Sequence, residues 1–241
     1  MKKNRKKLLL SIIIPAYNEE KTIAQIIKKV KKAKVHKDIR KEIIVIDDAS
    51  YDKTHSLLQK TKGIKVLKHK ENMGKGAAVR TGLEEAKGDL IIVQDADLEY
   101  DPNDYARLME PIMKKKTKVV YGSRLRNYPI RIVGTSRTPL LAHYLGNKFL
   151  TLFTNFLYGG EITDMETCYK VFHKEVVDGL VLNAQRFDFE PEITAKILKR
   201  GYKIYEVPIN VKPRGYNEGK KIGWKDGFGA VYTLVKYRFL D

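Results

Sequence analysis

The sequence of 241 residues has little of what marks secreted or membrane-spanning proteins. It contains one cysteine, Cys168, so no disulfide can form within the chain. No window of about 18 uninterrupted apolar residues exists, and we therefore expect no helix that spans a membrane. The basic N-terminal residues precede an apolar run that soon meets Pro15 and is too short for a secretory signal. We expect a protein that works in the cytoplasm, peripherally on the cytosolic face of a membrane.

Acidic residues are scarce relative to basic ones. Lysine and arginine number 47 against 29 aspartates and glutamates, which gives a net charge of +18. This excess favours polyanionic partners, namely nucleic acid, phosphorylated substrates or an anionic lipid surface. A lysine-rich, solvated surface explains the charge equally well. Charge alone therefore does not decide the function.

Over the first two-thirds of the chain, short aliphatic runs alternate with segments of helical periodicity, as in a parallel sheet with crossover helices. Strands are predicted over residues 8–14, 43–46, 65–67, 90–94, 119–121 and 203–207. Helices are predicted over residues 77–86, 103–114, 138–158, 187–200 and 229–239. A further helix is predicted after Asn18, which would cap it, and its apolar face consists of Ile23, Ile26, Ile27 and Val30. The predicted fold class is α/β, a doubly wound, Rossmann-like and mostly parallel sheet flanked by helices, built as a single domain.

Acidic side chains follow three of the predicted strands. The first strand leads into Glu19, the second into Asp48, and the fourth into Asp95, Asp97 and Glu99. A lone aspartate after a strand is most often a helix cap, but ligands of open parallel sheets bind beyond these strand ends. Carboxylates gathered there repel each other unless a cation lies among them. Asp95 and Asp97 offer the hard oxygen ligands of Mg²⁺ or Mn²⁺, which can share its coordination with a diphosphate.

Two other patterns do not carry the chemistry that they suggest. The glycine-rich segment 72–79 opens a helix, but it lacks the spacing of a phosphate-binding loop and the third glycine of a dinucleotide fingerprint. Cys168 and the five histidines show no metal-ligand spacing, so we expect no zinc site.

Taken in order, the motifs resemble those of a known family. They are Pro15-Ala16-Tyr17-Asn18-Glu19, Asp47-Asp48-Ala49-Ser50, Asn72-Met73-Gly74-Lys75-Gly76 and Asp95-Ala96-Asp97. Their order is similar to that of the family 2 inverting glycosyltransferases. The segments 122–124 and 164–170 narrow the resemblance to the polyprenyl-phosphate sugar synthases, such as the dolichyl-phosphate mannose and glucose synthases. It implies the GT-A fold, with a nucleotide-sugar and metal-binding part over residues 8–125 and an acceptor-binding part over 126–241.

The resemblance also implies roles for single residues. The donor would be a nucleotide-sugar of the GDP-mannose or UDP-glucose type. The residues implied to contact it are Pro15, Tyr17, Glu19, Ile46, Asp48 and Ala96. Arg214 and Lys220, in a basic C-terminal segment, would close over its phosphates. Those implied to hold Mg²⁺ or Mn²⁺ are Asp95, Asp97 and Glu99. Arg124 would bind the acceptor, a polyprenyl or dolichyl phosphate. Asp97 and Arg124 are the predicted catalytic residues.

The chemistry of the acceptor decides whether a base is needed. A phosphate monoester has a second pKa of about 6, so its nucleophilic oxygen is charged at neutral pH and needs no strong base. A transferase that extends a polysaccharide would have to activate a sugar hydroxyl, and its candidate bases are Asp164, Glu166 and Glu190. A sugar-phosphate nucleotidyltransferase would open with a glycine-rich basic loop where this chain has residues 15–19. No nucleic-acid partner is expected, because the clustered acids oppose one.

Residues 138–158 are predicted to form a helix that is too polar to span a bilayer and more apolar than an ordinary surface helix. This composition favours a helix in the interface of an anionic membrane, with a buried core helix as the alternative. Arg137 begins this helix, where a lipid head group would enter. We therefore prefer Arg137 to Arg131 as the second arginine at the acceptor phosphate.

Overall fold

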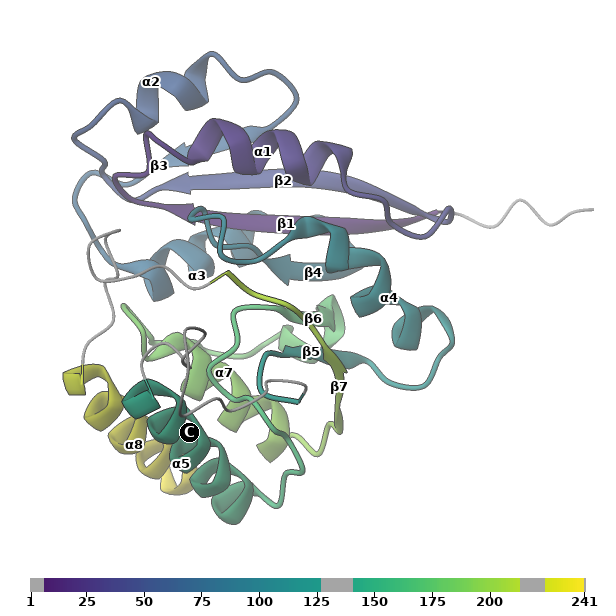
Figure 1. Cartoon of the computed structure of the whole chain (residues 1–241), viewed down its shortest axis with the longest axis vertical. Helices are drawn as coiled ribbons and strands as arrows, with labels where there is room; N and C mark the ends of the chain where they lie inside the picture. Colours follow the sequence, from purple (N-terminus) through teal and green to yellow (C-terminus); the bar gives the residue numbers. More distant parts are fainter. Residues whose placement is uncertain (1–6, 127–140, 213–223, 241) are drawn as a thin grey trace, which may run out of the picture.

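The computed structural model describes residues 7–126, 141–212 and 224–240. At its centre lies a seven-stranded sheet in the order β3-β2-β1-β4-β6-β5-β7 (Figure 1). The strands are β1 (Leu8–Ala16), β2 (Ile39–Asp47), β3 (Lys65–Lys68), β4 (Leu90–Val93), β5 (Val119–Ser123), β6 (Lys170–His173) and β7 (Ile204–Pro208). Strand β6 runs antiparallel to β4 and β5, whereas the other four pairings are parallel. The predicted α/β class and all six predicted strands are confirmed.

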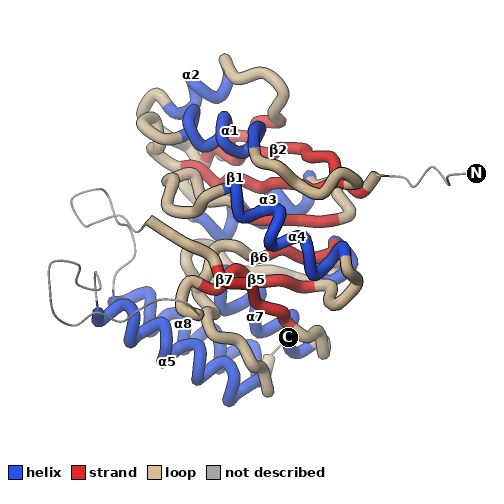
Figure 2. Tube along the Cα trace, turned by 45° about the vertical axis from the view of Figure 1, so that its right-hand side comes forward, coloured by secondary structure: helices blue, strands red, loops and turns tan. Residues whose placement is uncertain are grey.

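Helices flank this sheet on the described part of the chain (Figure 2). They are α1 (Ile23–Lys32), α2 (Thr54–Gln59), α3 (Lys75–Glu85), α4 (Tyr105–Met113) after the short 3-10 turn η1 (Pro102–Asp104), α5 (Leu141–Tyr158), α6 (Lys174–Val177), α7 (Phe189–Lys199) and α8 (Trp224–Phe239). Helix α3 packs against β1 and β2, and α4 packs against β5 and β7. Helices α5 and α8 pack against each other and against α7 at one end of the molecule.

The aliphatic character of β1 explains why it lies in the middle of the sheet. Ile12, Ile13 and Ile14 are fully buried, because β1 has a strand on either side and helices over both faces. Helix α1 turns the predicted apolar face inward, and its four apolar residues at 23, 26, 27 and 30 are buried. Its last turn carries Lys29, Lys31 and Lys32, which suits the negative end of the helix dipole.

The predicted capping role of Asn18 is wrong. Helix α1 begins at Ile23, and the backbone N–H groups of its start donate to the carbonyl oxygen of Glu19. Asn18 has a positive φ of 54° and faces the loop after β2 instead. Its N–H donates to Ser50 Oγ at 3.0 Å, and its side-chain oxygen accepts from the Tyr51 N–H at 3.1 Å. Asn18 therefore ties together two of the loops at the carboxyl edge of the sheet.

Strand β6 and the short helices α2 and α6 were not predicted from the sequence. The four residues of β6 begin with Lys170, whose charge interrupts the apolar pattern of a buried strand. The Lys170 ammonium is nevertheless fully buried and donates to the backbone carbonyls of Met165 and Thr167. Since β6 is antiparallel, it starts at the edge where β4 and β5 end. The residues just before it therefore arrive at the same edge as the acidic strand ends.

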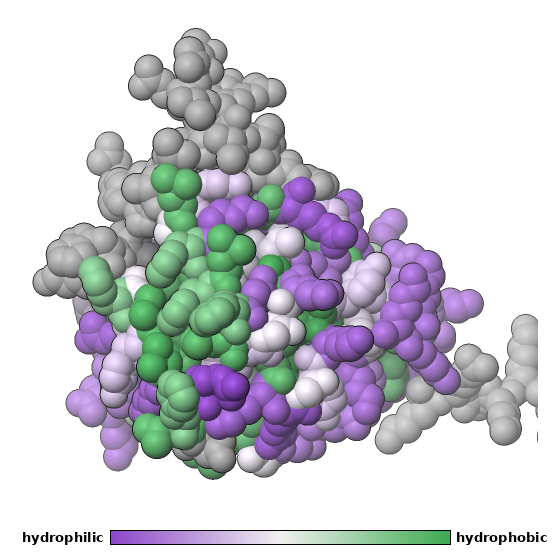
Figure 3. Space-filling model, turned by 90° about the horizontal axis from the view of Figure 1, so that it is seen from below, coloured by the Kyte–Doolittle hydropathy of each residue, from purple (hydrophilic) through white to green (hydrophobic). Residues whose placement is uncertain are grey.

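Helices α5 and α8 share a small core of their own with α7 and leave their outer faces exposed. The exposed large apolar side chains recur at the same spacing on both helices: Leu145, Phe149, Leu152 and Phe156 on α5, and Phe228, Tyr232, Val235 and Phe239 on α8. Figure 3 shows the apolar surface that gathers on this side of the molecule, which we call the α5–α8 face. Among the residues described, none of the helices has the length and apolar character to span a bilayer.

Candidate active site

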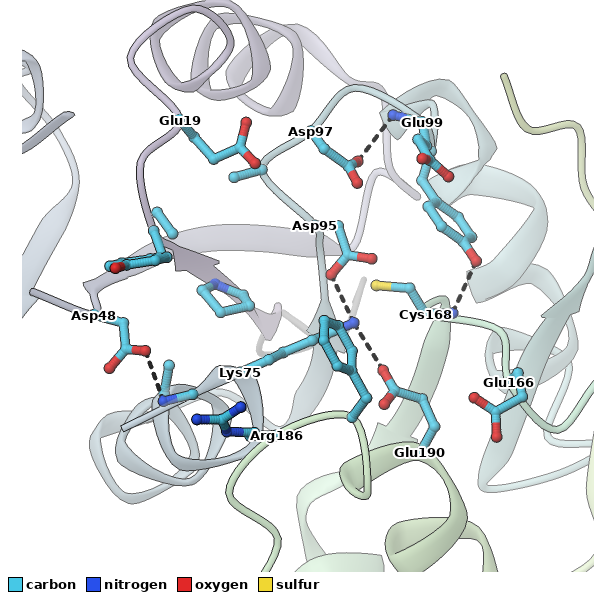
Figure 4. Close-up of a pocket in the computed structure, with 18 of the residues that line it drawn as sticks. Glu19, Asp48, Lys75, Asp95, Asp97, Glu99, Glu166, Cys168, Arg186 and Glu190 are labelled. Atoms are coloured by element: carbon cyan, nitrogen blue, oxygen red, sulfur yellow. Dashed lines mark hydrogen bonds and ion pairs between the residues drawn. The ribbon is translucent and has the colours of Figure 1, made fainter. Parts of the chain in front are cut away.

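A cavity of about 370 Å³ opens at the carboxyl edge of the strands (Figure 4). Its walls come from the ends of β1, β2, β4 and β5, the start of α3, the segment before β6 and the loop that leads into α7. The predicted site residues that line it are Pro15, Tyr17, Glu19, Asp48, Asp95, Ala96, Asp97, Glu99 and Arg124. The three acidic strand ends therefore meet at one place, as their positions after parallel strands predict.

Asp48 lines the cavity and also fixes one of its walls. Its Oδ1 lies 2.9 Å from the backbone nitrogen of Met73 and 2.7 Å from Nδ1 of His69. Its Oδ2 lies 2.7 Å from the backbone nitrogen of Gly74 and 3.0 Å from Nδ2 of Asn72. These donors compensate a carboxylate that is only 3% exposed. Asp48 thus holds the glycine-rich segment in place, a role that the sequence did not reveal.

The glycines of this segment allow α3 to begin against the loop before α7. Gly74 has a positive φ of 90°, and a Cβ on Gly74 or Gly76 would collide with the backbone of that loop. The N–H groups of Gly76 and Ala77 donate to backbone carbonyls of the same loop, at 3.1 Å each. This close approach brings Lys75 and Arg186 to one cavity. The glycine pattern therefore reflects contact between two chain segments.

Lys75, for which no role was predicted, lies at the centre of the site. Its ammonium nitrogen is 2.9 Å from Asp95 Oδ1 and 2.8 Å from Glu190 Oε1 (Figure 4). Burial by itself lowers the pKa of Lys75, but Asp95 and Glu190 outweigh it, and the pKa lies well above its ordinary value. Lys75 is therefore charged, and it neutralises two carboxylates that come from distant parts of the sequence.

The carboxylates of Asp95 and Asp97 both line the cavity after β4. One Asp97 oxygen accepts the backbone N–H of Glu99 at 3.0 Å, and one Asp95 oxygen faces Lys75. Within the part of the chain that the structure describes, no three His, Cys, Asp or Glu side chains are grouped so that they could hold a metal ion. The predicted trio that includes Glu99 is thus not assembled. Asp95 and Asp97 still fit Mg²⁺ or Mn²⁺, which commonly takes one or two carboxylates and completes its shell with water and substrate phosphates.

Arg124 follows β5 and is held in place by a buried partner. Its Nε and Nη2 donate to the two oxygens of Asp164 at 2.8 and 2.7 Å, and its backbone N–H donates to Asp164 as well. Asp164 is fully buried, whereas the side chain of Arg124 is 20% exposed and reaches the cavity. Burial alone lowers the pKa of Arg124, but Asp164 reverses this and holds the pKa well above its ordinary value. The pair fixes a guanidinium at the cavity wall.

A second carboxylate, Glu206, holds the segment that carries Asp164. Glu206 on β7 accepts hydrogen bonds from the N–H groups of Thr163 and Asp164 at 2.9 and 3.1 Å, and from Thr163 Oγ1 at 2.7 Å. It thereby orients the turn from which Asp164 reaches Arg124. Because both oxygens of Asp164 accept hydrogen bonds from Arg124, Asp164 is a poor candidate for a catalytic base.

Glu166 and Cys168 lie in the cavity wall just before β6. Burial raises the pKa of Glu166 to about 7, and the nearby Glu190 adds to the rise. The Cys168 thiol is buried, and burial raises its pKa well above the ordinary value, so it stays protonated. The sequence offered Glu166 only as one of three candidate bases, and it gave Cys168 no role.

Some predicted residues do not reach the site or fall outside the described part of the chain. Ile46 was expected at the nucleoside; its side chain is fully buried in the core and is not among the residues that line the cavity. Its position within β2, ahead of the strand end, turns it inward. Arg137, Arg214 and Lys220 lie outside the described residues. The cavity-lining residues that sequence analysis missed include Lys75, Asn147, Arg186 and Phe187.

Comparison with known proteins identifies the family. The family model described as Glycosyl transferase family 2 matches residues 11–181, which is well over half of the chain. The protein belongs to this family and is a glycosyltransferase. The resemblance inferred from the order of the motifs is thereby confirmed.

Several curated relatives are named for transfer to dolichyl phosphate. A UDP-N-acetylglucosamine–dolichyl-phosphate N-acetylglucosaminyltransferase of Methanococcus voltae is 28% identical, over 94% of this chain and 95% of the relative. A dolichyl-phosphate beta-glucosyltransferase of Trichomonas vaginalis is 31% identical, over 95% of this chain and 71% of the relative. A dolichol-phosphate mannosyltransferase of Pyrococcus furiosus is 28% identical, over 95% of this chain and 64% of the relative. The chain is thus similar to polyprenyl-phosphate sugar transferases that use different sugars.

Solved structures agree with this fold. Glucosyl-3-phosphoglycerate synthase from Mycobacterium tuberculosis, in complex with UDP, superposes with a TM-score of 0.73 at 19% identity, over 97% of this chain and 81% of that one. A structure of the same enzyme with Mn²⁺, UDP and its product gives the same score. The GT-A fold implied by the motifs is confirmed.

Proposed function

We propose that the protein transfers one hexose, with inversion, from a nucleotide-sugar to the phosphate of a polyprenyl or dolichyl lipid. The donor would be of the GDP-mannose or UDP-glucose type, and a divalent Mg²⁺ or Mn²⁺ ion would assist. The names of the relatives support this acceptor class. The structural observation that carries the proposal is one cavity whose wall holds two aspartates and a fixed arginine.

Asp95 and Asp97 would hold the metal at the donor diphosphate. When bound, the metal would stabilise the departing nucleoside diphosphate as a Lewis acid. Lys75 brings a positive charge to the same place, because its ammonium bonds Asp95. On the nucleoside side, the wall is formed by Pro15, Tyr17 and Glu19.

Arg124 would bind the acceptor phosphate and direct its charged oxygen toward the anomeric carbon. The planar guanidinium suits this task, since it can bond two phosphate oxygens in a fixed geometry. Asp164 keeps it from rotating, which reduces the entropy that acceptor binding must overcome. The acceptor oxygen is already ionised near neutral pH, so no side chain has to remove a proton from it.

The α5–α8 face suits an acceptor that resides in a membrane. Its side chains are strongly exposed, with Phe156 at 84% and Phe239 at 79% of their full accessibility. We propose that this face rests on an anionic membrane surface, on the cytosolic side, with the basic residues of the chain attracted to the lipid head groups. The sequence suggested this role for the segment of α5 alone. Helix α8 adds four further exposed apolar side chains to this face.

One panel of donors and acceptors tests the proposal. The protein is incubated with labelled UDP-glucose, UDP-N-acetylglucosamine and GDP-mannose, each with and without a polyprenyl phosphate and with and without Mn²⁺. We expect label in the lipid fraction with one donor, only when both lipid phosphate and metal are present. Label that appears instead on an oligosaccharide supports the alternative, a family 2 transferase acting on a sugar hydroxyl. The Glu166 pKa of about 7 favours that alternative, because it suits a general base.

A further inference from the structure

The cavity wall contains one carboxylate that the proposed transfer does not use. Glu166 lies between α5 and β6, in the segment that antiparallel β6 brings to the edge where β4 and β5 end. It lines the same cavity as Arg124 and Glu190. In Figure 4 its side chain is on the Glu190 side of the site, beyond Cys168.

The cations around Glu166 are engaged by other groups. Lys75 bonds Asp95 and Glu190, Arg124 is held by Asp164, and Lys170 donates to two backbone carbonyls. The Oε1 oxygen of Glu166 is buried and, among the residues described, has no hydrogen-bond partner. A buried carboxylate oxygen without a donor is costly, which indicates that a ligand supplies the donor.

The chemistry of this position selects the kind of ligand. Glu166 and Glu190 both line this part of the cavity, and two neighbouring carboxyl groups disfavour a phosphate beside them. A hydroxyl group is neutral and donates one hydrogen bond, so it compensates the oxygen without bringing in charge. The region between Lys75 at the donor end and Arg124 at the acceptor end is where the transferred sugar must pass, and that sugar carries several hydroxyl groups.

We propose that Glu166 accepts a hydrogen bond from a ring hydroxyl of the transferred sugar and so helps to determine which sugar the enzyme accepts. The inference rests on the proposed function, because that function places the sugar between Lys75 and Arg124. Glu166 is a contact to the substrate in this scheme and transfers no proton. A site that bonds a hydroxyl through a buried polar atom discriminates strongly against sugars that lack the hydroxyl or present it in another orientation.

Binding measurements on Glu166→Gln test the inference. The variant keeps the shape of the side chain and removes its charge, and Glu161→Gln, at an exposed glutamate of the same segment, is the control. Affinities are measured by calorimetry for UDP and GDP, for the nucleotide-sugars of the panel, and for monodeoxy analogues of the best donor. We expect Glu166→Gln to bind the nucleoside diphosphate as the wild type does and the nucleotide-sugar about tenfold more weakly. One deoxy analogue should bind weakly to the wild type and lose little more in the variant, because Glu166→Gln has already replaced the charge-assisted hydrogen bond that the analogue lacks by a weaker neutral one.

Each other outcome has a definite meaning. If Glu166→Gln weakens UDP or GDP as much as the nucleotide-sugar, or every deoxy analogue loses the same factor in both proteins, the inference is overturned and the proposed function stands. If donor affinities are unchanged but turnover on a hydroxyl acceptor collapses, Glu166 is a general base, which also overturns it. If the wild type binds no nucleotide-sugar of the panel, the proposed function fails and takes the inference with it.

Discussion

Replacing Lys75 with methionine tests the central ion pair of the cavity. Lys75, Asp95 and Glu190 are 17%, 19% and 6% exposed, so all three charges are largely removed from water. Methionine fills a similar volume but leaves two carboxylates facing each other without a counter-charge. Breaking a buried pair by removing one partner typically costs about 3–5 kcal/mol. For a chain of this size, such a loss lowers the melting temperature by about 6–20 °C.

The same substitution reports on metal binding without any measurement of activity. In the wild type, an ion bound at Asp95 would compete with the Lys75 ammonium for the carboxylate oxygen. In Lys75→Met this competition is gone, and an added ion replaces the missing positive charge. We therefore expect Mn²⁺ to raise the melting temperature of the variant by more than that of the wild type, since at a given concentration a ligand that binds more tightly stabilises the folded state more.

The assay is thermal unfolding of three proteins with and without Mn²⁺ and Mg²⁺. Lys28→Met, on the exposed face of α1, controls for the loss of one positive charge, and it should behave as the wild type. The reasoning is refuted if Lys75→Met melts at the wild-type temperature and gains nothing extra from the ions. That result would mean that Lys75 contributes no net stabilisation and that Asp95 is not a site for the metal.

Three further predictions concern other parts of the molecule. Asp97→Ala should reduce metal-dependent transfer at least about a hundredfold. Its melting temperature should change little, because the Asp97 side chain lies at the cavity and not in the core. Full turnover in this variant would contradict the assignment of Asp97 to the metal. Arg124→Lys should raise the KM for the lipid phosphate about 10- to 100-fold and leave donor binding unchanged, and weakened donor binding instead would place Arg124 at the nucleotide. Phe156→Asp should reduce flotation with anionic liposomes about tenfold or more at low salt without destabilising the fold, while equal flotation would exclude the α5–α8 face as the contact.

Much of the fold follows from the sequence because the strands of its parallel half are strongly aliphatic. Strand β1 contains three consecutive isoleucines that are fully buried, and no helix periodicity competes with that pattern. Strand β6 escaped prediction because half of its four residues are Lys170 and His173, and the burial of Lys170 depends on carbonyls supplied by tertiary structure. Local propensity does not encode such a partner. The same limit applies to Asn18, whose bonding partners lie on another loop.

Site residues that directly follow a strand were predicted from the sequence. Site residues whose role depends on an ion pair with a distant part of the chain were missed. Asp95 and Asp97 could be assigned to the site because they directly follow β4. Lys75 could not, since its two partners come from the segment after β4 and from α7, and the glycine-rich segment around it was predicted only to open a helix. A lysine between two glycines at the start of a helix was the available signal. Arg124 was placed correctly at the cavity, but its buried anchor Asp164 was considered only as a base.

The antiparallel insertion of β6 has a geometric consequence for catalysis. It separates two parallel strands, β4 and β5, which carry Asp95 and Arg124 just beyond their ends. Neighbouring strands are about 4.8 Å apart, so one inserted strand sets these two ends about 10 Å from each other. A sheet with β4 beside β5 would halve that span and bring Arg124, the proposed acceptor site, close to Asp95, a proposed metal ligand. Strand β6 therefore sets the distance between Asp95 and Arg124. In the proposed reaction, this distance corresponds to the width of the one sugar that passes between the two phosphates.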